Sequence, residues 1–164
     1  MALHGQACKD AIVQQRKAGK PQGEQRAGVV ANMRSMAQYE MSCSVLPQFL
    51  PEQSAPEQAV HTFAYTVTVT NKGSVAAQLI SRHWVICDAR GLREEVQGLG
   101  VVGQQPLLRP GESFEYTSGC RLRTPSGTMH GSYFFVAEDG TRFDAQIPLF
   151  VLEATATGAP RVVH

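Results

Sequence analysis

The chain has 164 residues, of which 43% are hydrophobic and 18% charged. This composition is typical of an ordinary soluble domain and excludes fibrous, wholly disordered and membrane-spanning classes. No stretch approaches the roughly 20 apolar residues that span a bilayer, and the N-terminus lacks the apolar run of a signal peptide. We therefore expect a cytoplasmic protein with no membrane partner.

The net charge of +1 conceals an uneven distribution along the chain. Residues 1–38 carry six basic and two acidic side chains, a net charge of +4, whereas the remainder carries nine and twelve, a net charge of −3. An acidic domain offers no footprint for phosphate backbones, so we expect no nucleic-acid partner.

The first 38 residues show no sustained apolar period and are rich in Gln, Ala and Gly. Such a segment buries too little apolar surface to offset its chain entropy. We predict a disordered basic extension over residues 1–38, followed by one folded domain over residues 39–164. Met33 and Met36 precede that domain, and either is a candidate for the true translation start.

Apolar and polar residues alternate from Tyr39 to Val45 and again from His61 to Thr70, which predicts two half-buried strands. Asp139-Gly140 predicts a hairpin whose two central residues both have positive φ. The remaining predicted strands are Ala77–Asp88, Arg93–Gln97, Ser113–Thr117, Cys120–Thr124, Gly131–Glu138 and Thr141–Val151.

Short strands, repeated Gly and Pro residues and the lack of a convincing helix predict an all-β domain. The connections are short, so we expect an antiparallel β-sandwich of immunoglobulin or fibronectin type III shape. The cysteines at positions 8, 43, 87 and 120 form no CxxC pair and the five histidines show no ligand spacing. We expect free structural thiols, no metal site and no cofactor.

Gly98, Gly100 and Gly103 match the pattern GxGxxG. In a dinucleotide-binding fold this motif opens a helix, but here it runs into Pro106 and then Arg109-Pro110-Gly111, so we expect no Rossmann site. Two interpretations remain open. The glycines allow a tight turn against a sheet edge, or their N–H groups form a concave nest for an anion.

Enzymatic motifs are absent: the chain has no GxSxG elbow, no P-loop lysine and no cysteine beside an evident base. Glu94 and Glu95 are interpreted as solvated strand residues rather than an acid and base pair. Met129 lies between Gly127 and Gly131, which predicts a surface loop for its side chain. We expect a protein that is not an enzyme; a hydrolase of phosphorylated nucleotides that uses the glycine-rich loop and Glu94 or Glu95 is the least favoured alternative.

The runs Glu95–Pro106, Pro110–Glu112, Tyr116–Gly119 and Thr124–Gly131, together with Phe63–Val69, strongly resemble the bacterial ApaG family over Tyr39 to His164. The resemblance implies a fibronectin type III-like sandwich, and an association with cobalt resistance and magnesium efflux without an established enzymatic activity. The related eukaryotic domain occurs in certain F-box proteins and in a polymerase delta-interacting protein, where it looks like an interaction module.

Two functions follow from these expectations. The first is a non-catalytic module that binds a protein partner through loops at one end of the sandwich, with Gln97, Gln104, Tyr116 and Met129 as interaction residues. The second is binding of phosphate, pyrophosphate or a nucleotide, with or without a divalent ion, at Gly98, Gly100 and Gly103. Exposed strand edges also predict a homodimer.

Overall fold

The computed structural model describes residues 15–16 and 38–155. Its strands are β1 Gln15–Arg16, β2 Met41–Phe49, β3 His61–Asn71, β4 Ala77–Asp88, β5 Arg93–Leu99, β6 Leu107–Leu108, β7 Ser113–Leu122, β8 Ser126–Ala137 and β9 Arg142–Glu153. Two short 3-10 helices, η1 Pro51–Gln53 and η2 Pro56–Gln58, lie between β2 and β3. No helix in the described part of the chain is long and apolar enough to cross a membrane.

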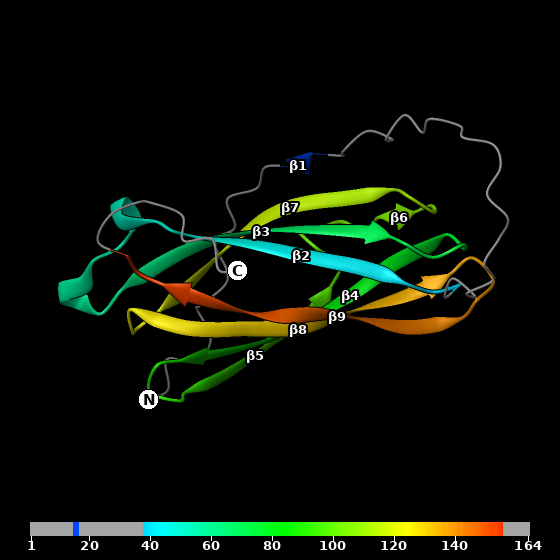
Figure 1. Cartoon of the computed structure of the whole chain (residues 1–164). Coiled ribbons are helices and arrows are strands. Elements are labelled where there is room, and N and C mark those ends of the chain that lie inside the picture. Colours follow the sequence, from blue (N-terminus) through cyan, green and yellow to red (C-terminus); the bar gives the residue numbers. More distant parts are fainter. Residues whose placement is uncertain (1–14, 17–37, 156–164) are drawn as a thin grey trace, which may run out of the picture.

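The strands form two stacked sheets, with strand orders β1-β7-β3-β2 and β5-β4-β8-β9 (Figure 1). The short β6 pairs with β4 on the same side as β5. Every pair of neighbouring strands is antiparallel. The predicted all-β antiparallel sandwich is confirmed, while the finer likeness to fibronectin type III stays a prediction.

The core fills the space between the sheets because alternate residues of each strand point inward. On β3 the inward set includes Phe63 and Tyr65, both almost fully buried. Tyr65 meets Trp84 of β4 edge-on, with ring centroids 5.3 Å apart, and Phe150 of β9 at 6.0 Å. Aromatic contacts of this kind join the two layers and fix how they stack.

The four edge strands of the two sheets, β1, β2, β5 and β9, differ in what lies next to them. Strands β2 and β9 lie against each other and close one side of the sandwich. On the other side β7 pairs with β1, whereas β5 ends its sheet at the lower margin of Figure 1. Among the described residues β4 is the only strand that pairs with β5, so this edge is open.

The largest differences between the observed and the predicted strands are in β7 and β8. Ser113–Thr117 and Cys120–Thr124 were expected as separate strands, but β7 runs without a break because β3 pairs with it throughout, including Tyr65 with Ser118 and Ala64 with Gly119. The expected strand from Gly131 begins five residues earlier, at Ser126. Gly131 marks a close approach of β8 to β4 rather than a loop, since a Cβ there would lie 2.0 Å from the carbonyl oxygen of His83.

The hairpin at Asp139-Gly140 is present, but the expected turn type is wrong. Gly140 alone has a positive φ, +86°. Its N–H donates to the carbonyl of Ala137 at 2.9 Å, and the N–H of Ala137 donates to Thr141 at 2.8 Å. This is a type I turn closed by a left-handed glycine, the common three-residue hairpin.

The predicted N-terminal extension lies outside the described residues, except for Gln15–Arg16 and residue 38. In β1, Gln15 stands opposite Tyr116 and Arg16 opposite Glu115. Of the described cysteines, Cys43 and Cys87 are free thiols in strands, as expected, and Cys120 is buried in β7.

Candidate binding surface beside the glycine loop

The glycine-rich segment folds into a miniature hairpin at the end of β5. The N–H of Val101 donates to the carbonyl of Gln104 at 2.8 Å, and the N–H of Gln104 donates back to Val101 at 3.0 Å. Between them Val102 and Gly103 have φ of +50° and +75°. Positive φ at both central residues defines a type I′ turn, and for a β-branched residue such as Val102 it is a strained conformation.

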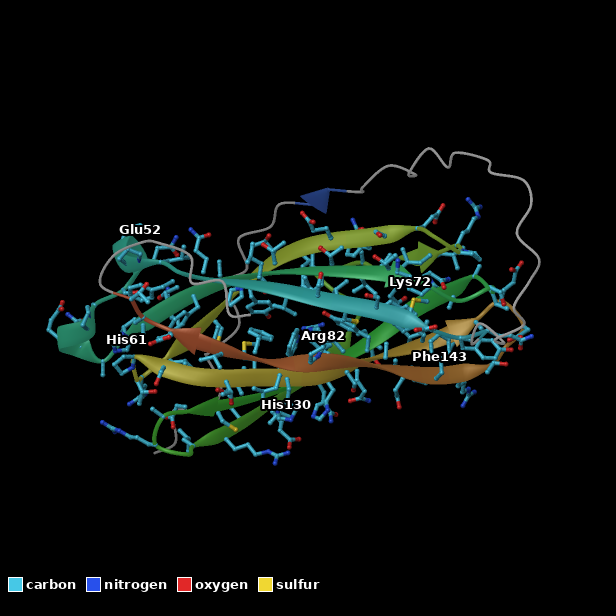
Figure 2. The ribbon with its side chains drawn as sticks, viewed as in Figure 1. Glu52, His61, Lys72, Arg82, His130 and Phe143 are labelled. Carbon is cyan, nitrogen blue, oxygen red and sulfur yellow. The ribbon has the colours of Figure 1, made fainter. Side chains whose placement is uncertain are left out.

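Arg82 of β4 hydrogen-bonds to the backbone of this loop. Its Nη1 donates to the carbonyl oxygens of Leu99 at 3.1 Å and Gly100 at 2.9 Å. Arg82 stands opposite buried Tyr133 in the β4–β8 register, so its side chain is on the inner side of the sheet, between the layers (Figure 2). The arginine therefore ties the loop to the core.

Each glycine of the motif has a separate structural reason. A Cβ at Gly98 would lie 2.9 Å from Nη1 of Arg82, so this glycine leaves room for the guanidinium. Gly100 has φ of +64°, and a Cβ there would lie 2.4 Å from the carbonyl oxygen of Gln104. Gly103 needs only its positive φ, because nothing lies within 4 Å of a Cβ there.

The backbone N–H groups of the loop are largely engaged within the chain. The N–H of Gly100 donates to the carbonyl of Ile80 at 2.8 Å. The N–H of Val101 donates to the carbonyl of Gln104, and the N–H of Gln104 donates to the carbonyl of Val101. An anion nest requires successive N–H groups that converge on the ligand. These bonds interrupt such a run on both sides of Val102 and Gly103, so the geometry favours the tight-turn interpretation.

A shallow groove of about 520 Å³ crosses the outer face of the β5-β4-β8-β9 sheet next to the loop. Its rim includes Leu99, a leucine whose side chain is 75% exposed. The lining residues are Ser81, Arg82, His83, Gln97, Gly98, Leu99, Ser132, Phe134 and Asp144. Hydroxyl, amide and apolar groups thus share one surface.

An ion network borders the groove. Glu95 accepts from Arg93 Nη2 at 2.6 Å and lies 3.2 Å from Nε2 of His83. The hydrogen bond from Arg93, and then that from His83, hold the pKa of Glu95 below its usual value. Because all three side chains are substantially exposed, this network orients the groups more than it stabilises the fold.

Comparison with known proteins places this geometry in a family. Residues 51–137 match the ApaG domain. The chain belongs to the ApaG family. It is 63% identical over 133 residues to the protein ApaG of Acidovorax sp. (strain JS42), covering 77% of this chain and 97% of that protein. It is 60% identical to protein ApaG of Thiobacillus denitrificans, covering 77% and 95% of the two chains.

A solved structure agrees with the relatives. The crystal structure of the protein called ApaA from Bordetella pertussis is 55% identical to this chain, with a TM-score of 0.72. The match covers 74% of this chain and 99% of the Bordetella pertussis chain. The ApaG resemblance predicted from the loop motifs is therefore confirmed, together with the fold.

Two of the four expected interaction residues in this ApaG domain are buried, and the prediction for them is wrong. Met129 is fully buried within β8, and Tyr116 within β7 is 2% exposed. The hydroxyls of Tyr116 and Tyr133 hydrogen-bond to each other across the two sheets. Burial raises the pKa of both phenols. Neither Tyr116 nor Met129 can present its side chain to a partner.

The other expected residues gather around the loop. Gln97 lines the groove, and Gln104 closes the miniature hairpin. The sequence-based reasoning missed Arg82, Leu99 and Phe134, which lie in strands rather than in turns. For Leu99 a signal existed in its place within the glycine motif, but only the sheet register shows which way its side chain points.

Within residues 15–16 and 38–155, no group of three or more His, Cys, Asp or Glu side chains is arranged to hold a metal ion. His83 contacts Glu95, and Glu95 in turn contacts Arg93.

Proposed function

We propose that this ApaG protein is a non-catalytic module that binds a protein partner through the outer face of β5-β4-β8-β9, where the groove meets the glycine loop. The observation that carries the proposal is Leu99, which is three-quarters exposed beside a groove lined by Ser81, Gln97 and Ser132. An exposed apolar side chain within a rim of hydrogen-bonding groups is the usual anatomy of a protein-binding site.

The rigidity of the surface supports this assignment. Arg82 hydrogen-bonds to the backbone of Leu99 and Gly100, so the main chain that carries the leucine is anchored before a partner arrives. A preformed contact avoids the entropy cost of ordering a loop upon binding. His83, which lines the groove, has its Nε2 beside Glu95, which is itself held by Arg93. This contact orients the imidazole on the proposed binding surface.

A module of this kind would act in cobalt resistance and magnesium efflux, with which the resemblance associates the family, through the partner that it binds. Phosphate or nucleotide binding at Gly98, Gly100 and Gly103 is the less favoured alternative, because the N–H groups of Gly100, Val101 and Gln104 already have carbonyl partners.

The test compares two leucines on opposite faces of the sandwich. Leu99→Asp places a charge on the proposed surface, and Leu46→Asp places one on the outer face of β2, where Leu46 is 69% exposed. The full-length wild-type protein is used to capture partners. Each captured protein is then purified and titrated with the wild type and with both variants. We expect Leu99→Asp to weaken binding at least tenfold, or about 1.4 kcal/mol, and Leu46→Asp to leave it unchanged.

Equal affinities of both variants and the wild type for every purified partner would refute the proposal. Thermal unfolding of the variants provides the control, because both substitutions are at exposed positions and should leave the midpoint nearly unaltered.

A further inference from the structure

The open edge of β5 presents a defined set of backbone groups. The carbonyl of Leu92 accepts from Asp88 at 3.0 Å, and the N–H of Gly100 donates to Ile80 at 2.8 Å, both on the β4 side. In an antiparallel strand every second residue directs both its N–H and its C=O to the same neighbour. Even-numbered residues of β5 therefore bond to β4, and Arg93, Glu95 and Gln97 direct theirs outward.

These outward groups are suited to another strand. The side chains at the three odd positions are exposed on the outer face of the sheet, beside the groove. At the next odd position, Leu99, the carbonyl already accepts from Arg82, so the fully available stretch ends at Gln97. An unprotected edge of this kind pairs readily with a strand of a second chain.

We propose that β5 pairs antiparallel with β5 of a second copy of this chain, about a twofold axis at Val96. In this register Glu95 stands opposite Gln97 of the second copy, and these two symmetry-related pairs exchange backbone hydrogen bonds. Val96 stands opposite its own counterpart on the inner face of the sheet, while Arg93 stands opposite Leu99. No two like charges are directly opposed.

The neighbouring registers are each less favourable. A twofold axis at Glu95 or at Glu94 would place that carboxylate directly opposite its own copy, and directly opposed like charges destabilise a strand pair. An axis at Gln97 would rely on Leu99 as a fully bonded partner, although Arg82 occupies its carbonyl. Charge and backbone availability thus select Val96.

This pairing joins the β5-β4-β8-β9 sheets of the two copies into one continuous sheet and places the two grooves on the same face. An isologous interface of this kind is the commonest form of homodimer, because one patch serves both copies. The inference goes beyond the proposed partner binding and does not depend on it, since the edge groups and not the groove make the contact.

Charge substitutions at Gln97 test the register in the full chain. Gln97→Glu opposes a carboxylate to Glu95 in both symmetry-related pairs, whereas Gln97→Lys opposes an ammonium group to it. From the strength of exposed cross-strand pairs, we expect Gln97→Glu to weaken dimerisation roughly fivefold and Gln97→Lys to strengthen it by a similar factor at low salt. Sedimentation equilibrium measures both constants, and circular dichroism verifies that each variant is folded.

A disulfide test reports the axis directly. The inferred register brings Val96 next to Val96 of the second copy, so Val96→Cys should form an intermolecular disulfide under mild oxidation. Leu99→Cys is the matched control, because its thiol is far more exposed but stands opposite Arg93. Wild type shows the background from the native cysteines. We expect faster cross-linking for Val96→Cys than for Leu99→Cys.

A chain that remains monomeric at all accessible concentrations would overturn the proposal. So would a dimer that responds identically to Gln97→Glu and Gln97→Lys, or one in which Leu99→Cys cross-links faster than Val96→Cys. If β5 instead pairs with a strand of another protein, this chain would be monomeric on its own. Gln97→Pro, which removes one outward N–H, would then abolish the binding of that protein. That result would also refute self-pairing.

Discussion

Alanine substitutions at the three motif glycines separate a structural loop from a ligand site. Gly103→Ala places a Cβ in open space and costs only the left-handed conformation, about 1 kcal/mol. For a domain of this size such a loss lowers the melting temperature by about 3–5 °C. Gly100→Ala carries the same cost and also drives its Cβ to 2.4 Å from a backbone oxygen. We expect a total loss above about 3 kcal/mol.

Gly98→Ala has a different mechanism, because its Cβ meets the end of a flexible side chain. Arg82 must move and lose its hydrogen bonds to Leu99 and Gly100, which costs about 1–3 kcal/mol. In a chain that already carries Arg82→Ala, the guanidinium is absent, so Gly98→Ala should lower the free energy of unfolding very little further. The two substitutions are therefore coupled, by at least about 1 kcal/mol in a double-mutant cycle.

Urea unfolding of the four single variants and of Arg82→Ala with Gly98→Ala measures these free energies, with the slope m held to the wild-type value as a check on two-state behaviour. The reasoning fails if Gly103→Ala is as damaging as Gly100→Ala. It also fails if Gly98→Ala and Arg82→Ala are additive.

Three further predictions follow from the described contacts. Met129→Ala should lower the free energy of unfolding by about 2–5 kcal/mol in urea denaturation because its side chain is fully buried, whereas Leu46→Ala should change it by less than about 0.5 kcal/mol. Burial raises the pKa of Cys43 from 9.0 to about 11. The contribution of the neutral thiol to the free energy of unfolding is therefore complete below pH 9 and is lost as the pH rises toward 11. Cys43→Ala should flatten this part of the pH profile of the free energy of unfolding measured in urea. Titration calorimetry with millimolar pyrophosphate, with and without magnesium, should show no binding heat, and saturable heat that Gly100→Ala removes would restore the anion-nest interpretation.

Alternation of apolar and polar residues predicted most of the sandwich correctly. In β3 buried residues alternate with half-buried ones, and along most of β9 exposed residues alternate with buried or half-buried ones, so the period of two is visible in the residues themselves. The turn Arg109-Pro110-Gly111-Glu112 also follows from its residues, and Gly111 has φ of +81° with Glu112 bonded back to Arg109. Local chemistry is sufficient where one residue type alone fits the backbone.

Glycines inside strands misled the prediction. Gly119 was interpreted as a break between two strands, and Gly127 and Gly131 as residues that leave Met129 on a surface loop, yet all three glycines lie in continuous strands. At Gly131 the missing side chain admits the backbone of β4, and that need is invisible without knowing which strands are neighbours. The same error placed Met129 in a surface loop.

By itself, the sequence of this protein determined its family, its all-β class, the place of most strands and the tight turns, because these depend on residue type and on spacing along the chain. The tertiary structure alone decided that Tyr116 and Met129 are buried, that Arg82 reaches under the glycine loop, and that Leu99 and the edge of β5 face solvent. Those facts depend on sheet register and strand order, which join residues far apart in the chain, and a shift of one residue would have exchanged the buried and exposed faces.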